Sequence, residues 1–299
     1  MNDALPSLSS PPALSSPPAP PLPGRVLGID VGGSGTRVVL LEHGTVTPQP
    51  DGPPMNANIT AGFAGHLLRI IRAADATAAG VGMAGLRLDT QAAELSATLS
   101  EQAGCPVHVT GDADTAQAGA FLGGPGVVVI AGTGSMAFGR DGDSHARAGG
   151  HGFILGDEGS AYWIGRAAVQ AALRWEEGLG GSEPIHRMVL AATGTDLDAL
   201  VGDITSRPAE RSRLTALAPA LTALAATDGE ARRITRSSAE HLAALAGSVR
   251  DRLGPLPVSG AGRVFGAGLI WDRFAELTGA ARPLADAAVG AALLAARYA

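Results

Sequence analysis

The sequence contains no lysine, so all 22 of its basic side chains are arginines. A Walker-type phosphate loop needs a lysine that reaches the phosphates, and Schiff-base catalysis needs a lysine amine. Both classes of protein are therefore excluded for this chain of 299 residues.

Cysteine and aromatic residues are scarce as well. Cys105 is the only cysteine, so one chain by itself forms no disulfide, no thiolate zinc cage and no four-cysteine cluster. A lone thiol is typical of a reducing compartment, and we expect a cytoplasmic protein. Aromatic residues make up only 4% of the chain, too few for the stacking platforms that bind single-stranded nucleic acid.

The charge and the hydropathy pattern narrow the choice of partner. The net charge of −6 argues against nucleic acid and anionic membranes, because neither supplies an opposite charge. No segment has the roughly 18 uninterrupted apolar residues of a membrane span. No G-x-S-x-G elbow and no H-E-x-x-H motif occurs, which argues against the hydrolases built on them. We expect a small-molecule substrate.

Apolar strand patterns alternate with helical ones along most of the chain. Residues 1–23 differ, because they hold 8 of the 20 prolines, and we expect a disordered tail there. The rest predicts a mixed α/β protein with two related halves, 24–111 and 112–283, the second with a helical insertion. The final helix, 284–299, is expected to return to the first half.

Three glycine-rich turns each follow a short apolar strand. Glycine lets backbone N–H groups approach an anion, and neighbouring hydroxyl side chains add donors, so the turns predict a phosphate-binding cradle. Plain hairpin turns are the alternative. The first two turns contain Gly32, Gly33, Ser34 and Thr36, then Gly132, Thr133, Gly134 and Ser135; the third contains Gly260, Ala261 and Gly262.

Two aspartates lie at strand ends near these turns. Asp30 would repel a phosphate unless Mg²⁺ bridged them, which argues against a dinucleotide-binding fold, where the turn meets the pyrophosphate without a metal. Turn capping is the alternative for Asp30. Asp112 is a candidate general base for a substrate hydroxyl, and Asp114 is its competitor, with helix capping as the alternative role.

The segment 149–160 is the densest cluster of glycine and polar residues in the chain. Asp157 and Glu158 can accept hydrogen bonds from sugar hydroxyls or simply cap the helix that follows. His151 fits no familiar metal-ligand spacing, and a structural histidine is the alternative.

These motifs resemble those of the N-acetylglucosamine kinase and BadF/BadG/BcrA/BcrD ATPase family, in the actin/hexokinase/Hsp70 superfamily. The resemblance covers residues 25–299, and its most specific part is GGHGFILGDEGSAYWIGRAA. It implies two ribonuclease-H-like (actin-like ATPase) domains that close over ATP and a sugar, with an interdomain cleft.

The resemblance also implies roles for individual residues. Asp30 would hold Mg²⁺, Asp112 would be the catalytic base, and the first two glycine turns would bind the phosphates of ATP. Gly260, Ala261 and Gly262 would lie near the adenosine. The resemblance implies sugar binding by Asn56, Gly150, Gly152 and Asp157, and the full set of expected substrate-binding residues adds Asp112, His151 and Glu158.

Three positions depart from the family pattern. His151 replaces a tryptophan of the sugar loop, Gly111 replaces an asparagine before the catalytic aspartate, and Val31 replaces the first glycine of the opening turn. Because His151 lies in the sugar loop, its replacement of the tryptophan concerns whether the protein recognises an N-acetyl sugar.

The expected function is an ATP-dependent kinase that phosphorylates a hydroxyl of an amino sugar such as N-acetylglucosamine or glucosamine. One alternative is an ATPase that activates a dehydratase, but its shared iron–sulfur cluster needs two cysteines per chain. The other is a non-catalytic sugar sensor, although the basic DNA-binding helix of such repressors is missing. A homodimer is implied by resemblance only.

Overall fold

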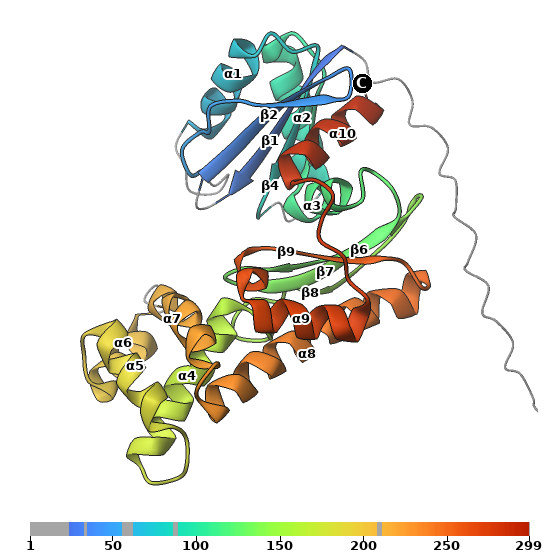
Figure 1. Cartoon of the computed structure of the whole chain (residues 1–299). Helices are drawn as coiled ribbons and strands as arrows, with labels where there is room; N and C mark the ends of the chain where they lie inside the picture. The colour runs from blue at the N-terminus through green and yellow to red at the C-terminus, as the bar shows by residue number, and fades with distance from the viewer. Residues whose placement is uncertain (1–23, 33–34, 56–61, 86–88, 208–210, 299) are drawn as a thin grey trace, which may run out of the picture.

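The computed structural model describes residues 24–32, 35–55, 62–85, 89–207 and 211–298. The expectations for the tail 1–23 and for Gly33, Ser34 and Asn56 lie outside these residues. The described chain forms two α/β bodies, each built on one sheet, with α3 and α10 close to the junction between them (Figure 1).

The first body is built on a five-stranded sheet with the order β3-β2-β1-β4-β5. β1 and β2 form the expected antiparallel hairpin, while β1, β4 and β5 run parallel, so their carboxyl ends meet at one edge. The strands are β1 (Arg25–Gly32), β2 (Gly35–Glu42), β3 (Thr45–Pro48), β4 (Ala78–Met83) and β5 (Val107–Gly111).

Helices cover both faces of this sheet. One face packs on α1 (Phe63–Ala73) and α2 (Asp89–Ala103) through a core that includes Leu67 and Leu99. The other face packs on α10 (Ala287–Tyr298), which comes from the far end of the chain and contacts β1, β2 and β4. This helix begins later than the expected residue 284, because Asp286 caps it by accepting a hydrogen bond from Val289 N at 3.0 Å.

The second body is built on a four-stranded sheet with the order β8-β7-β6-β9. β6 is antiparallel to β7 and parallel to β9, so the second and third glycine turns follow adjacent strands. The strands are β6 (Gly126–Ala131), β7 (Ser135–Asp141), β8 (Ser144–Gly149) and β9 (Val258–Ala261).

The segment expected to be helical does form helices. The long helix α8 packs against β6, β7 and β8, and α4 to α7 gather to one side of this sheet (Figure 1). The helices of this body are α4 (Ala161–Glu176), α5 (Glu183–Thr193), α6 (Leu197–Ser206), α7 (Arg211–Leu224), α8 (Gly229–Leu253) and α9 (Gly268–Thr278), with the short 3-10 helix η2 (Arg263–Gly266) before α9.

Helix α3 (Asp112–Ala120) links the two bodies. It packs most extensively on α10 and also contacts β4 of the first sheet and β6 of the second. The division of the chain at residue 111 stays a prediction. No helix in the described part of the chain is long and apolar enough to cross a bilayer.

Two strand glycines allow α10 to lie directly on the first sheet. A Cβ added to Gly80 would lie 1.9 Å from the carbonyl oxygen of Ala291, and one added to Gly28 would lie 2.0 Å from that of Ala288. We therefore expect Gly80→Ala to lower the free energy of unfolding by about 1–3 kcal/mol, since the helix has to move away. Urea denaturation measures this loss.

The matched control is Gly65→Ala in α1, where an added Cβ meets no atom within 4 Å. Because alanine favours a helix over glycine, this variant should be as stable as the wild type or more stable. Equal stability of Gly80→Ala and Gly65→Ala would contradict the proposed close packing of α10.

Candidate active site

The carboxyl-terminal edge of the first sheet brings two of the expected aspartates together. Asp30 on β1 lies opposite Gly82 of β4, and Gly82 lies opposite Thr110 of β5, two residues before Asp112. At this level β4 contributes only Gly82, which has no side chain, between Asp30 and the end of β5 that leads into Asp112.

Asp30 is a crowded carboxylate. Its pKa is raised to about 6, mainly by burial and also by the negative charges of Asp112 and Asp286, against the opposing effect of Arg37. Arg37, its cross-strand neighbour on β2, forms an ion pair with Asp286 at 3.2 Å. A cation bound beside Asp30 would relieve this repulsion.

Asp112 is the first residue of α3 and is mostly withdrawn from solvent. Burial raises the pKa of its carboxyl group, partly opposed by its hydrogen bond from the Ala113 backbone. Its competitor Asp114 instead forms an ion pair with Arg140 of β7 at 2.5 Å. Of these two aspartates, Asp112 is the one without an ion pair among the described residues.

The second glycine turn is joined to the start of α4. Ala161 N donates to Gly132 O at 2.9 Å, and Tyr162 N donates to Thr133 O at 3.3 Å. The first turn of the helix thus donates hydrogen bonds to two carbonyls of the glycine turn. The backbone amides of Thr133 and Gly134 have no acceptor among the described residues. Free amides beside a helix amino terminus favour an anion.

The same turn is joined to the expected sugar loop. The Asp157 carboxylate accepts a hydrogen bond from Ser135 N at 3.2 Å, and Ser135 Oγ donates to Glu158 O at 2.7 Å. The absent side chain of Gly134 leaves room for this carboxylate, because a Cβ there would lie 2.7 Å from Asp157 Oδ1. Asp157 itself has a left-handed backbone, with φ of 63°. The glycine turn 132–135 and the loop 149–160 are therefore one connected unit.

Two residues predicted to bind phosphate, Thr36 and Ser135, have hydroxyl groups that donate to protein carbonyls, so their binding of ATP stays a prediction. The hydroxyl of Thr36 is buried and donates to Pro53 O at 2.7 Å, and the hydroxyl of Ser135 is used by Glu158. Neither is free to donate to a phosphate. Thr133, in contrast, is exposed and lines a cavity.

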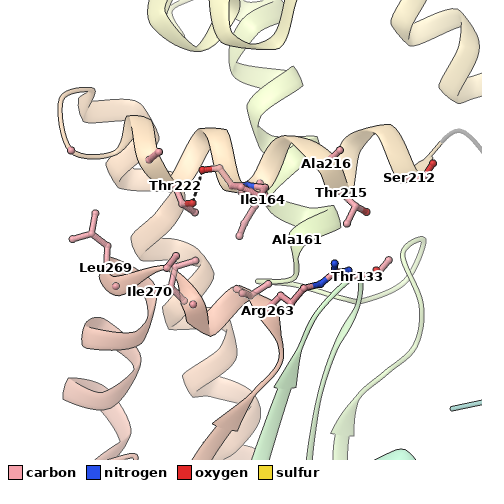
Figure 2. Close-up of a pocket in the computed structure, with 18 residues that line it drawn as sticks. Thr133, Ala161, Ile164, Ser212, Thr215, Ala216, Thr222, Arg263, Leu269 and Ile270 are labelled. Carbon is pink, nitrogen blue, oxygen red and sulfur yellow. Dashed lines mark hydrogen bonds between the residues drawn. The ribbon is translucent and has the colours of Figure 1, made fainter. Parts of the chain in front are cut away.

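That cavity has a volume of about 800 Å³ and lies between α4, α7 and the η2–α9 segment. Figure 2 shows Thr133 and Arg263 close together at one end, with Leu269 and Ile270 at the other. Small residues of α7 form the opposite wall: Ser212, Thr215, Ala216, Ala218, Pro219, Thr222 and Ala223. The cavity is thus polar beside the second glycine turn and apolar away from it.

The third glycine turn supports this cavity and does not line it. Gly262 has φ of 101°, and a Cβ on it would lie 2.3 Å from Ala131 O, so glycine brings β9 close to the end of β6. Gly260 and Ala261 belong to β9 itself. The next residue, Arg263, lines the cavity and was not among the predicted site residues. The sequence did offer a signal for Arg263: it directly follows a glycine turn, and in a chain without lysine an arginine has to supply any positive charge at an anion site.

The rest of the sugar loop folds back on the same turn. Gly150 N donates to Ser135 O at 2.9 Å, and Gly150 and Gly152 both have positive φ, 72° and 80°. The side chains of His151 and Glu158 are exposed on this loop. The roles of Gly32, Gly150, His151, Gly152, Asp157 and Glu158 in binding stay predictions.

The residues present fit Mg²⁺ shared with a bound phosphate better than a metal held by protein alone. Among the described residues, no group of three or more His, Cys, Asp or Glu side chains is placed to hold a metal ion. Mg²⁺ commonly binds through one or two carboxylates plus phosphate oxygens and water. Asp30, repelled by its acidic neighbours, offers such a single carboxylate.

Comparison with known proteins places this site in a family. Residues 27–295 match the BadF/BadG/BcrA/BcrD ATPase family. The chain belongs to this family. A curated relative, the N-acetylmuramic acid/N-acetylglucosamine kinase of Clostridium acetobutylicum, is 48% identical over 69 residues, which are 23% of this chain and 22% of the relative.

Solved structures of similar proteins share the fold. A putative N-acetylglucosamine kinase from Chromobacterium violaceum is 28% identical, with a TM-score of 0.73 over 91% of this chain and 99% of that one. A ROK family glucokinase from Streptomyces griseus is 19% identical, with a TM-score of 0.61 over 92% of this chain and all of that one, and shows the fold alone. The predicted α/β fold with two actin-like halves is confirmed.

The crowding of Asp30 predicts a pH-dependent cost to stability. Its pKa rises from 3.8 to about 6 on folding, so the folded state binds its proton more tightly and loses stability as the pH rises through this range. In metal-free buffer, Asp30→Asn should be more stable than the wild type by roughly 1–3 kcal/mol at pH 7.5. The difference should vanish below about pH 4.

Urea denaturation of both proteins in the presence of a chelator, at the two pH values, measures the effect. The acidic pH provides the internal control, because both side chains are then neutral. Equal stabilities at pH 7.5 would contradict the burial and repulsion assigned to Asp30.

Proposed function

We propose that this protein is an ATP-dependent kinase that transfers the γ-phosphoryl group to a hydroxyl of an amino sugar. The observation that carries the proposal is that one glycine turn, 132–135, borders both the nucleotide-sized cavity and the loop of Asp157. Donor and acceptor sites built on one turn would hold their ligands side by side. The family and the amino-sugar kinases among its relatives support this function.

The cavity suits a nucleotide in one orientation. The apolar end by Leu269 and Ile270 would take the base, and the end by Thr133 and Arg263 would take the phosphates. Arg263 supplies a guanidinium, which pairs well with phosphate oxygens. The amides of Thr133 and Gly134 add donors beside the positive end of α4.

Asp112 would act on the acceptor. Its carboxylate takes the proton of the attacking hydroxyl as the new O–P bond forms and the bond to ADP breaks. Mg²⁺ bound near Asp30 supplies charge neutralisation for the phosphates. The carboxylate of Asp157, held by Ser135 N, and the backbone of Gly150 would orient the sugar hydroxyls. We further propose that the protein acts in the cytoplasm.

The dehydratase-activator alternative is not favoured. Cys105 is partly buried against the first core, and burial raises the pKa of its thiol, which disfavours the thiolate that a cluster requires.

Asp112→Asn should abolish most phosphoryl transfer while leaving ATP binding intact. Loss of a general base typically costs about 10²- to 10⁴-fold in kcat. The matched control Asp114→Asn removes an ion pair with Arg140. It should lower the free energy of unfolding and change kcat much less than Asp112→Asn does. A coupled ADP-release assay across a panel of amino sugars measures transfer. Retained transfer in Asp112→Asn would remove Asp112 from this role.

The same assay gives a pH dependence. Because burial raises the pKa of Asp112, kcat/KM in the wild type should rise with pH through a value above the ordinary 3.8 of an aspartate.

Ala216→Phe should block the nucleotide cavity. Ala216 is exposed on the α7 wall, so an aromatic ring there occupies the space proposed for ATP. We expect the KM for ATP to rise by about 10-fold or more, with a smaller change in the KM for the sugar. The control Ala191→Phe changes an exposed alanine of α5, outside the cavity lining. An unchanged KM for ATP in Ala216→Phe would place the nucleotide elsewhere.

A further inference from the structure

Arg147 lies where the last strand of the second sheet enters the glycine loop. It belongs to β8, opposite Phe138 of β7, and is three residues before Gly150. A Cβ added to Gly150 would lie 3.0 Å from Arg147 Nη2, so the guanidinium lies over the backbone of the proposed sugar loop. The absent side chain of Gly150 makes room for it.

The guanidinium of Arg147 is free within the described part of the chain. It forms no ion pair there, whereas Arg140 on the neighbouring strand is paired with Asp114. The backbone of Arg147 is anchored, because its carbonyl accepts a hydrogen bond from Arg252 Nη2 at 2.6 Å. An exposed guanidinium without an ion pair can form charge-assisted, bidentate hydrogen bonds with an anion.

The guanidinium of Arg147 lies within electrostatic range of the candidate base Asp112. Asp112 is close enough for the charge of Arg147 to lower the pKa of its carboxyl group, against the larger effect of burial that raises it. Asp157 and Glu158 follow on the same loop. An arginine that stays unpaired beside carboxylates is available to a ligand, and it lies at the acceptor side, apart from the cavity that Arg263 lines.

We propose that Arg147 is the specificity residue of a subsite for a carboxylate substituent on the acceptor sugar, a role that rests on the proposed function. A guanidinium binds a carboxylate through two parallel hydrogen bonds. His151, exposed on the same loop, adds a ring N–H donor in its neutral form. A carboxylate brings one negative charge, whereas a phosphate substituent would bring a second charge toward the acidic groups around Asp112.

Two sugars that differ by one acidic substituent test this subsite. N-acetylmuramic acid is N-acetylglucosamine with a carboxylate-bearing lactyl ether on carbon 3. We expect Arg147→Gln to lower kcat/KM for the acidic sugar by about 10- to 100-fold more than for the neutral one, mainly through KM. Arg147→Lys keeps the charge without the planar fork and should recover part of this preference.

Arg187→Gln is the matched charge control. Arg187 is exposed on α5, and among the described residues it pairs only with Glu183 on the same helix, at 3.4 Å. This variant loses the same charge away from the loop and should leave the ratio between the two sugars unchanged. A uniform loss for both sugars in Arg147→Gln, with a shifted pH profile, would overturn the subsite and make Arg147 a residue that positions Asp112.

Isothermal titration calorimetry of both sugars separates this inference from the proposed function. If the wild type transfers phosphate to neither sugar yet binds the acidic one in an Arg147-dependent way, the kinase function fails and the subsite stands. If the wild type phosphorylates the neutral sugar and does not bind the acidic one, the subsite is overturned and the function stands.

Discussion

The hydrogen bond from Ser135 N to the Asp157 carboxylate is the contact on which the candidate site depends. It joins the glycine turn after β6 to the loop that leads into α4, across 22 residues of sequence. The reciprocal bond from Ser135 Oγ to Glu158 O and the absent side chain of Gly134 make this approach possible. Because of it, a phosphate bound by the turn and a sugar bound by the loop would have fixed relative positions.

A second constraint holds Asp112 in place. Helix α3, which Asp112 begins, crosses α10 with almost no space between their backbones. A Cβ on Gly290 would lie 1.9 Å from Thr115 O, and one on Gly119 would lie 2.1 Å from Asp286 O. Helix α10, near the end of the chain, thus packs tightly against the helix that carries the candidate base. Asp286, which precedes α10, forms an ion pair with Arg37 on the first sheet. Positioning of this kind is the main contribution a protein makes to phosphoryl transfer.

The charge distribution follows a simple division. The carboxylates of Asp30 and Asp112 lie where a metal and a hydroxyl proton would be bound, and burial, with a smaller effect of neighbouring carboxylates, raises the pKa of both. Two guanidinium groups that form no ion pair with any described residue lie where anions would bind, Arg263 at the cavity proposed for the nucleotide and Arg147 at the loop proposed for the sugar. A chain without lysine uses arginine for both tasks, which favours planar, bidentate contacts over point charges.

Local sequence signals determined the hairpins, the glycine turns and the two strand-end aspartates, because those features depend on neighbouring residues and on the period of apolar side chains. Only the tertiary structure determined which hydroxyl groups already donate hydrogen bonds to protein carbonyls. Thr36 and Ser135 resemble free donors in the sequence, yet they are bound by carbonyls 17 and 23 residues away. The α7 wall of small residues gave no signal by itself, since a cavity exists only where two distant segments fail to fill the space between them.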